Sequence, residues 1–155
     1  MGVTGRGRSL RGHTLALLFL LVMEFLIGMW VNLFVKIPPH HPGVSPSYFA
    51  GVAGGVPWAL LHGPLVLQLH VALGLILGLM GIAHLVRLIR DLGAGRLWWS
   101  VVGLLGLSSA AGNGASFLNY GHNFSSMLMS VGFALALVGY GMSIGNGRRA
   151  ATLNG

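Results

Sequence analysis

The stretch "LQLHVALGLILGLMGIAHLVRLIR", residues 67–90, is a continuous apolar run that carries a histidine near each end, His70 and His84. It is long enough to cross a bilayer, because about 20 helical residues cover roughly 30 Å of hydrocarbon. On an α-helix, fourteen residues turn the chain through about 1400° and raise it by roughly 21 Å. The two imidazoles therefore share one face at two depths, about 40° apart around the axis.

The composition is that of an integral membrane protein. Of the 155 residues, 54% are hydrophobic and only 7% are charged, which excludes a soluble domain with a charged surface. The net charge of +7 comes from short basic clusters beside apolar runs, a pattern typical of membrane topology, so nucleic acid is not an expected partner. The absence of cysteine excludes disulfides, thiolate metal sites and covalently attached haem.

Four apolar segments predict an all-α membrane protein with four transmembrane helices in a single domain, residues 1–155. We place the helices at about 12–35, 58–90, 97–117 and 121–144. Pro57 suits the start of the second helix. The Pro- and Gly-rich segment 36–57 is predicted to be the outer loop, and the short connections elsewhere favour an antiparallel four-helix bundle.

Basic residues predict the orientation of this bundle. They cluster before the first span, between the second and third spans and after the fourth, whereas only Lys36 lies on the other side. The positive-inside rule therefore places both termini in the cytoplasm, and we expect a multi-pass protein of a prokaryotic plasma membrane. The arginines concerned are Arg6, Arg8, Arg11, Arg87, Arg90, Arg96, Arg148 and Arg149.

Glycines lie between the two histidines on the same helix face. Gly74 and Gly81 are on that face and Gly78 is close to it. Small residues at such spacing most often pack helices together, but a notched wall also leaves room for a flat ring. Two imidazoles on this wall favour haem b, because neutral histidines ligate its iron and polar groups in hydrocarbon tend to mark cofactors.

Each haem needs a second ligand from another helix at a similar depth. His13 lies two residues beyond Arg11, and His84 lies three residues before Arg87, so both are about one turn inside the cytoplasmic boundary. This match in depth makes His13 and His84 the predicted ligand pair of an inner haem.

The predicted partner of His70 is His122, at the start of the fourth helix. Since a straight fourth helix would raise His122 above His70, Met127 or Met129 remains an alternative thioether ligand. The loop pair His40–His41 is compatible with a surface metal or with no ligand at all.

Several other residues are expected to contact a cofactor. Arginines near the cytoplasmic side, Arg11, Arg87 and Arg96, are placed to meet haem propionates, although their topological role is sufficient to explain them. The small and polar segment 108–126 contains Asn113 and Tyr120. One interpretation of this segment is close packing beneath the outer loop, because small residues let backbones approach. The alternative is a polar pocket, with Asn113 and Tyr120 around an outer haem edge or a quinone head group.

Glu24 is the one acidic residue inside a predicted span. It follows His13 by eleven residues, so it lies on nearly the same helix face. A structural role would keep this carboxyl protonated and hydrogen-bonded to Asn113 or a serine. The functional alternative, which makes Glu24 the candidate catalytic residue, is delivery of protons to a quinone or a reduced oxygen species.

The assembled residues resemble the small four-helix di-haem b-type cytochromes, the cytochrome b561-like group that includes membrane superoxide:quinone oxidoreductases. The resemblance is architectural and rests on four spans, on H-x13-H at His70 and His84, and on the partner histidines His13 and His122. It implies that one helix supplies a ligand to each of two haems, which carry electrons across the membrane to or from a quinone.

The sequence therefore predicts a transmembrane b-type cytochrome with two haems, or one, which would make it a quinone-linked oxidoreductase if it is an enzyme. Two other classes remain open. One is a non-catalytic subunit or assembly factor of a larger membrane complex, with glycine faces against partner helices. The other is a pigment-binding protein whose single histidines ligate chlorin magnesium. A homo-oligomer is compatible with all three.

Overall fold

The computed structural model describes residues 3–90 and 94–153, and this part of the chain is all helical, with five helices and no strand. Four helices contain segments that are long and apolar enough to cross a membrane: Leu10–Phe34, Leu65–Arg90, Gly95–Tyr120 and Asn123–Ile144. The predicted all-helical chain with four such segments is confirmed. The helices are α1 (Val3–Phe34), α2 (Tyr48–His62), α3 (Leu65–Arg90), α4 (Ala94–Tyr120) and α5 (Asn123–Leu153).

The prediction of one continuous helix over 58–90 is wrong, because the helix is interrupted at Gly63 and Pro64. The Gly63 N–H donates to the carbonyl of Trp58 at 3.1 Å and ends α2. Pro64 has no N–H with which to continue the helix, and its carbonyl accepts from the Gln68 N–H at 3.0 Å as α3 begins. Pro57, expected at the helix start, lies inside α2. The expected outer loop 36–57 is therefore partly helical.

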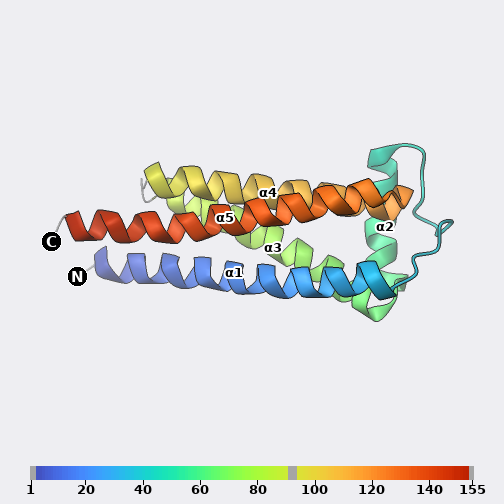
Figure 1. The fold of residues 1–155 in the computed structure, drawn as a ribbon, viewed down its shortest axis with the longest axis horizontal. Coiled ribbons are helices and arrows are strands. Elements are labelled where there is room, and N and C mark those ends of the chain that lie inside the picture. Colours follow the sequence, from blue (N-terminus) through green and yellow to red (C-terminus); the bar gives the residue numbers. More distant parts are fainter. Residues whose placement is uncertain (1–2, 91–93, 154–155) are drawn as a thin grey trace.

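Each of the four long helices contacts two of the others. α1 packs against α3 and α5, and α4 packs against α3 and α5. In Figure 1, α1 begins and α5 ends at the left, and α2 lies across the opposite end of the long helices. There α2 packs on α3 and α4. This arrangement gives the molecule two distinct ends, and the end that carries α2 is called the α2 end below.

The tightest seam joins α4 and α5 through small residues. A Cβ added to Gly106 would lie 2.5 Å from the backbone N of Ala136, and one added to Gly132 would lie 2.6 Å from the backbone N of Ala110. The two backbones therefore touch without intervening side chains, as small residues allow in membrane helices.

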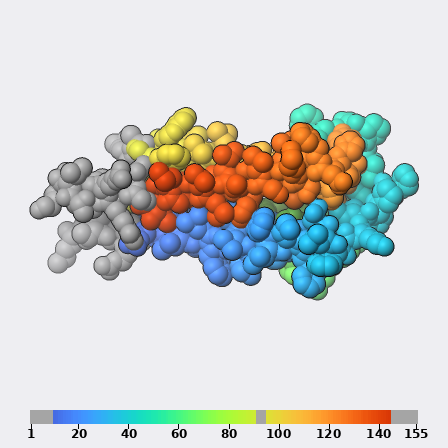
Figure 2. All heavy atoms as spheres, viewed as in Figure 1, coloured from blue at the N-terminus to red at the C-terminus, as the bar shows by residue number. Residues whose placement is uncertain are grey.

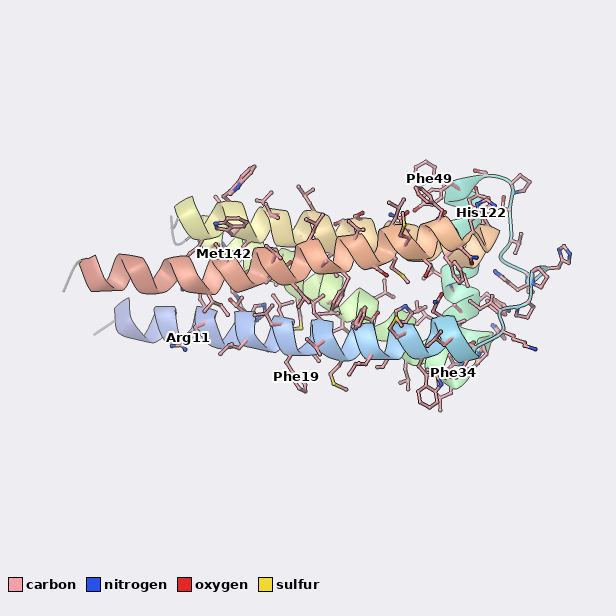
Figure 3. All side chains as sticks on the ribbon, viewed as in Figure 1. Arg11, Phe19, Phe34, Phe49, His122 and Met142 are labelled. Carbon is pink, nitrogen blue, oxygen red and sulfur yellow. The ribbon has the colours of Figure 1, made fainter. Side chains whose placement is uncertain are left out.

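The buried core consists of two apolar clusters. The larger one fills the middle of the long helices, and the smaller one lies beneath α2. On the outside, large apolar side chains are exposed, for example Phe19 at 65% and Leu79 at 70%, and Phe19 and Phe34 project away from the helices in Figure 3. In Figure 2, α1 and α5 cover the face turned to the viewer. An apolar surface of this extent fits a lipid environment. The larger cluster comprises Leu17, Leu21, Leu77, Leu107, Ala136 and Tyr140.

The seam generates a stability prediction. We expect Gly132→Val to force α4 and α5 apart and to lower the free energy of unfolding by about 1–3 kcal/mol, because overpacking a tight contact costs that much. Thermal unfolding in detergent, followed by circular dichroism, measures the loss. Gly141→Val is the matched control on the same helix, because a Cβ at Gly141 meets nothing within 4 Å. Equal destabilisation by both changes would show that helix propensity, not the seam, is responsible.

Candidate functional site

His13 of α1 and His84 of α3 lie side by side. Their ring centroids are 5.5 Å apart and their planes differ by 12°. His84 is buried, with 1% of its surface exposed. The match in depth along the two helices predicts this juxtaposition, and the structure confirms that the two rings meet. Their role as metal ligands stays a prediction.

The two rings differ in their hydrogen bonding. A guanidinium can only donate, so His13 Nδ1 accepts from Arg87 Nη1 at 3.3 Å, and His13 Nε2 carries the proton and donates to the carbonyl of Met80 at 3.2 Å. His84 has no partner for either ring nitrogen within the described residues. Buried polar atoms are normally paired, so His84 is the side chain of this pair that is free to bind a ligand.

Tyr140 of α5 completes the cluster and was not anticipated. It is fully buried, its ring meets His84 edge to face at 5.9 Å, and its hydroxyl has no partner among the described residues. Glycines on two other helices make room for it: a Cβ on Gly81 would lie 2.7 Å from its hydroxyl, and one on Gly103 would lie 3.1 Å from its ring. Only the register between helices reveals this fit, so the sequence held no usable signal.

Glu24 lies beside His70, not beside the expected Asn113 or a serine. Glu24 Oε1 is 2.9 Å from His70 Nδ1, while the Asn113 side chain donates to the carbonyl of Ser109 at 2.8 Å. That expectation was wrong because α1 faces α3 and α5, and Asn113 belongs to α4. The same carboxyl group also lies against the glycine-lined face of α3, formed by Gly74, Gly78 and Gly81 and called the glycine wall below. A Cβ on Gly74 would lie 3.2 Å from Glu24 Oε1.

The glycine wall is thus largely filled by this chain's own side chains. Glu24 occupies the space at Gly74, and Tyr140 occupies the space at Gly81. A Cβ at Gly78 would meet nothing within 4 Å. Of the three glycines expected to contact a cofactor, only Gly78 is open.

The histidine expected to pair with His70 has a different neighbour. His122 is exposed and stacks on Tyr120, with ring centroids 5.8 Å apart. Figure 3 places His122 near α2 and Arg11 toward the opposite end of the molecule. Of the alternative thioethers, Met127 is 53% exposed, and the sulfur of Met129 lies 3.3 Å from the position of a Cβ on Gly114.

The three arginines expected at haem propionates differ in position. Arg87 contacts His13. Arg11 is exposed on α1, and the backbone carbonyl of Arg96, near the start of α4, accepts from the Ser143 hydroxyl at 3.4 Å. Arg87 is therefore the arginine whose side chain contacts the histidine pair, and the charges of both Arg96 and Arg87 act on His84.

At the α2 end, His41 is a buried structural residue. Its Nδ1 accepts from the Gly43 N–H at 3.2 Å, its Nε2 donates to the carbonyl of Leu118 at 3.1 Å, and its ring stacks on Trp58 with centroids 4.0 Å apart. Both ring nitrogens are thus engaged in holding the loop to α4. His40, its neighbour in sequence, is exposed.

Side chains of α4 also form hydrogen bonds with the loop between α1 and α2, residues 35–47. Asn119 accepts from the Ser45 N–H at 2.9 Å and donates to the Ser45 carbonyl at 2.8 Å, and Tyr120 donates to the carbonyl of Pro46 at 3.2 Å. Tyr120, expected at a cofactor, therefore contacts the loop. A cavity of about 240 Å³ lies nearby, lined by Asn32, Val35, Ile37, Pro38, Pro39 and residues 117–121.

Comparison of the chain with protein-family models, with curated proteins and with solved structures finds no match.

The unpartnered hydroxyl of Tyr140 generates a test. We expect Tyr140→Phe to raise the free energy of unfolding slightly, by up to about 1 kcal/mol, because it removes a buried hydroxyl that lacks a hydrogen bond. Tyr48→Phe is the control: it deletes a hydroxyl that donates to the Gly112 carbonyl at 2.9 Å, and it should lower that free energy by about 1 kcal/mol. Thermal unfolding in detergent compares the two. A loss in Tyr140→Phe as large as in the control would mean that the hydroxyl has a partner in the folded protein.

Proposed function

We propose that the four long helices form an antiparallel transmembrane bundle in a prokaryotic plasma membrane, with both termini in the cytoplasm. The supporting observation is the distribution of charge over the two ends. Arg11 lies near the start of α1, and Arg87 and Arg90 close α3, whereas Lys36 follows α1 at the α2 end. Cationic residues retained on one side are the signature of a cytoplasmic face.

Within this bundle we propose a b-type cytochrome whose haem iron is held by His13 and His84. The observation that carries the proposal is the buried His84, which has two unpartnered ring nitrogens and lies 5.5 Å, centroid to centroid, from a second imidazole on the facing helix. Two neutral imidazoles without any thiol are a donor set that suits haem b. The group would supply reversible one-electron transfer.

The chain's own residues have separate tasks in this proposal. His84 offers a free nitrogen. His13 would offer its Nε2 only after the proton that it donates to the Met80 carbonyl has moved to Nδ1, and this move would end the hydrogen bond from Arg87. Arg87 brings a permanent positive charge to the pair, which favours an anionic group such as a propionate. The apolar cluster of Leu17, Leu21 and Leu77 excludes water on the side toward the α2 end.

The geometry favours one haem over two. His70 is engaged with Glu24, and His122 with Tyr120, so no second pair of facing imidazoles supports a haem near His70 in the part of the chain that the structure describes. A membrane-soluble quinone is the proposed redox partner, and with it the protein would act as a quinone-linked oxidoreductase.

The alternative proposal is a non-catalytic subunit or assembly factor of a larger membrane complex. The observation in its favour is the glycine wall, because Glu24 and Tyr140 fill the space at Gly74 and Gly81. Gly78 alone leaves an open notch on α3, which suits a partner helix.

Spectroscopy separates these proposals. We expect protein purified from haem-replete cells to show sharp alpha bands in its reduced-minus-oxidised spectrum, as low-spin haem does, and to contain one haem per chain. His13→Ala and His84→Ala should abolish haem binding, because each removes a proposed ligand. Haem content, measured against protein, checks this.

His122→Ala is the matched control, because it removes an exposed histidine and should leave the haem content unchanged. A folded but colourless wild-type protein would favour the non-catalytic subunit, and far-red absorption would favour a chlorin pigment. The one-haem proposal gives His70 no role as a ligand. Loss of haem in His70→Ala would contradict it and would favour His70 as a haem ligand.

A further inference from the structure

Glu24 and His70 form an isolated acid–base pair within the spans. Glu24 Oε1 lies 2.9 Å from His70 Nδ1, and the side chains are 13% and 19% exposed. Neither Glu24 Oε2 nor His70 Nδ1 makes a hydrogen bond among the described residues, so the two side chains are in contact at 2.9 Å without an aligned hydrogen bond. In hydrocarbon, an unpaired carboxylate or imidazolium is costly. The pair therefore favours states of zero net charge, in which it holds one proton.

No other titratable or charged group contacts the pair within the described residues. On α1 and α3, the nearest are His13 and His84, which lie eleven and fourteen residues away, or about 16 and 21 Å along the helices. The titratable and charged residues of the helices packed against α1 and α3 lie away from the pair. Tyr140 on α5 lies in the larger apolar cluster with Leu17, and the other such residues are near helix ends. These are Tyr48 and His62 on α2, Arg96 and Tyr120 on α4, and Arg148 and Arg149 on α5.

The surroundings of the pair differ toward the two ends of the molecule. Toward the histidine pair, Leu17, Leu21 and Leu77 are at most 1% exposed and form a buried apolar layer. Toward the α2 end, Asn32 lies eight residues beyond Glu24, about 12 Å along α1. Its side chain accepts from the Ser126 hydroxyl at 3.1 Å and lines the cavity of about 240 Å³. Asn32 and the cavity therefore lie on one side of the pair, and the buried apolar layer lies on the other.

Gly28 makes this arrangement possible. A Cβ at this position would lie 2.8 Å from His70 Cε1, so any larger residue must displace the imidazole. The absent side chain lets His70 lie against α1 within reach of Glu24.

We propose that Glu24 and His70 are one proton-binding site in the membrane interior, which takes up and releases a single proton through the α2 end. The proposal rests on the transmembrane placement proposed above and not on the haem. It replaces the expectation of a lone relay carboxyl with a two-residue site of defined sidedness.

A hydrophobic carbodiimide, dicyclohexylcarbodiimide, tests the site. The carboxyl proton moves to a carbodiimide nitrogen, the carboxylate oxygen bonds to the central carbon, and the acyl group then shifts to nitrogen. The adduct keeps every atom of both reactants, and mass spectrometry detects it. Only the protonated carboxyl reacts, so the rate of labelling reports the proton on Glu24.

Sealed membrane vesicles from expressing cells allow the pH to be set separately on each side. We expect the rate of labelling of Glu24 to fall as the medium at the α2 end becomes alkaline, by about tenfold per pH unit once the proton is lost. The pH at the other end should not change this rate. Lys36, the one lysine of the chain, identifies the α2 end through its reaction with an impermeant amine reagent.

Three variants test the partnership. Glu24→Gln should give no adduct. His70→Phe should keep labelling at alkaline pH, because a carboxyl without a base retains its proton in hydrocarbon, and Gly28→Ala should do the same by displacing the imidazole. His122→Phe, which removes an exposed histidine near the same end, should follow the wild type.

Three results would overturn the proposal: no Glu24 adduct in wild-type protein whose circular dichroism shows folded helices, labelling that follows the pH opposite to Lys36, or identical pH profiles for His70→Phe and wild type. A Lys36 reaction from the cytoplasmic side would instead contradict the proposed topology while leaving the site intact. The labelling is read without reference to haem content, so it is independent of the spectra.

Discussion

Polar side chains within the long helices must find their partners inside the protein, because hydrocarbon offers no water to bind them. This constraint explains most of the interior. His13 meets Arg87 and a backbone carbonyl, and Glu24 meets His70 across two helices. His84 and the hydroxyl of Tyr140 are buried without partners. They mark one place where the protein alone does not meet the requirement, and the proposed ligand site follows from it. Glu24 Oε2 and His70 Nδ1, which also lack a hydrogen bond among the described residues, mark a second place.

The two polar levels are separated by the apolar cluster around Leu17 and Leu77. An electron can cross such a layer by tunnelling between redox groups, whereas a proton needs a chain of donors and acceptors. The proposed haem site and the proposed proton site therefore face opposite ends of the molecule. A redox reaction that consumes protons would draw them from the α2 end without opening the layer.

How far the sequence predicts this molecule depends on the range of each signal. Hydropathy predicts the four apolar helices because it is local, and similar distances from the boundary arginines predict that His13 meets His84. The dipeptide Gly63–Pro64 is itself a local turn signal, but Pro57 satisfies the preference for proline at a helix start equally well, so the sequence does not decide between the two positions. The contacts of Glu24 with His70 and of Tyr140 with Gly81 depend on which helices are neighbours and on their rotation, which no local pattern contains.

The glycine and alanine seam between α4 and α5 also bears on how the chain assembles. Only Gly121 and His122 separate the two helices, with Gly121 at a φ of 67°, so closing the loop costs little chain entropy. The seam residues have no rotamers to lose when they pack. Of the contacts between long helices, this one thus has the smallest ordering cost, and α4 and α5 are suited to enter the membrane as a preformed hairpin.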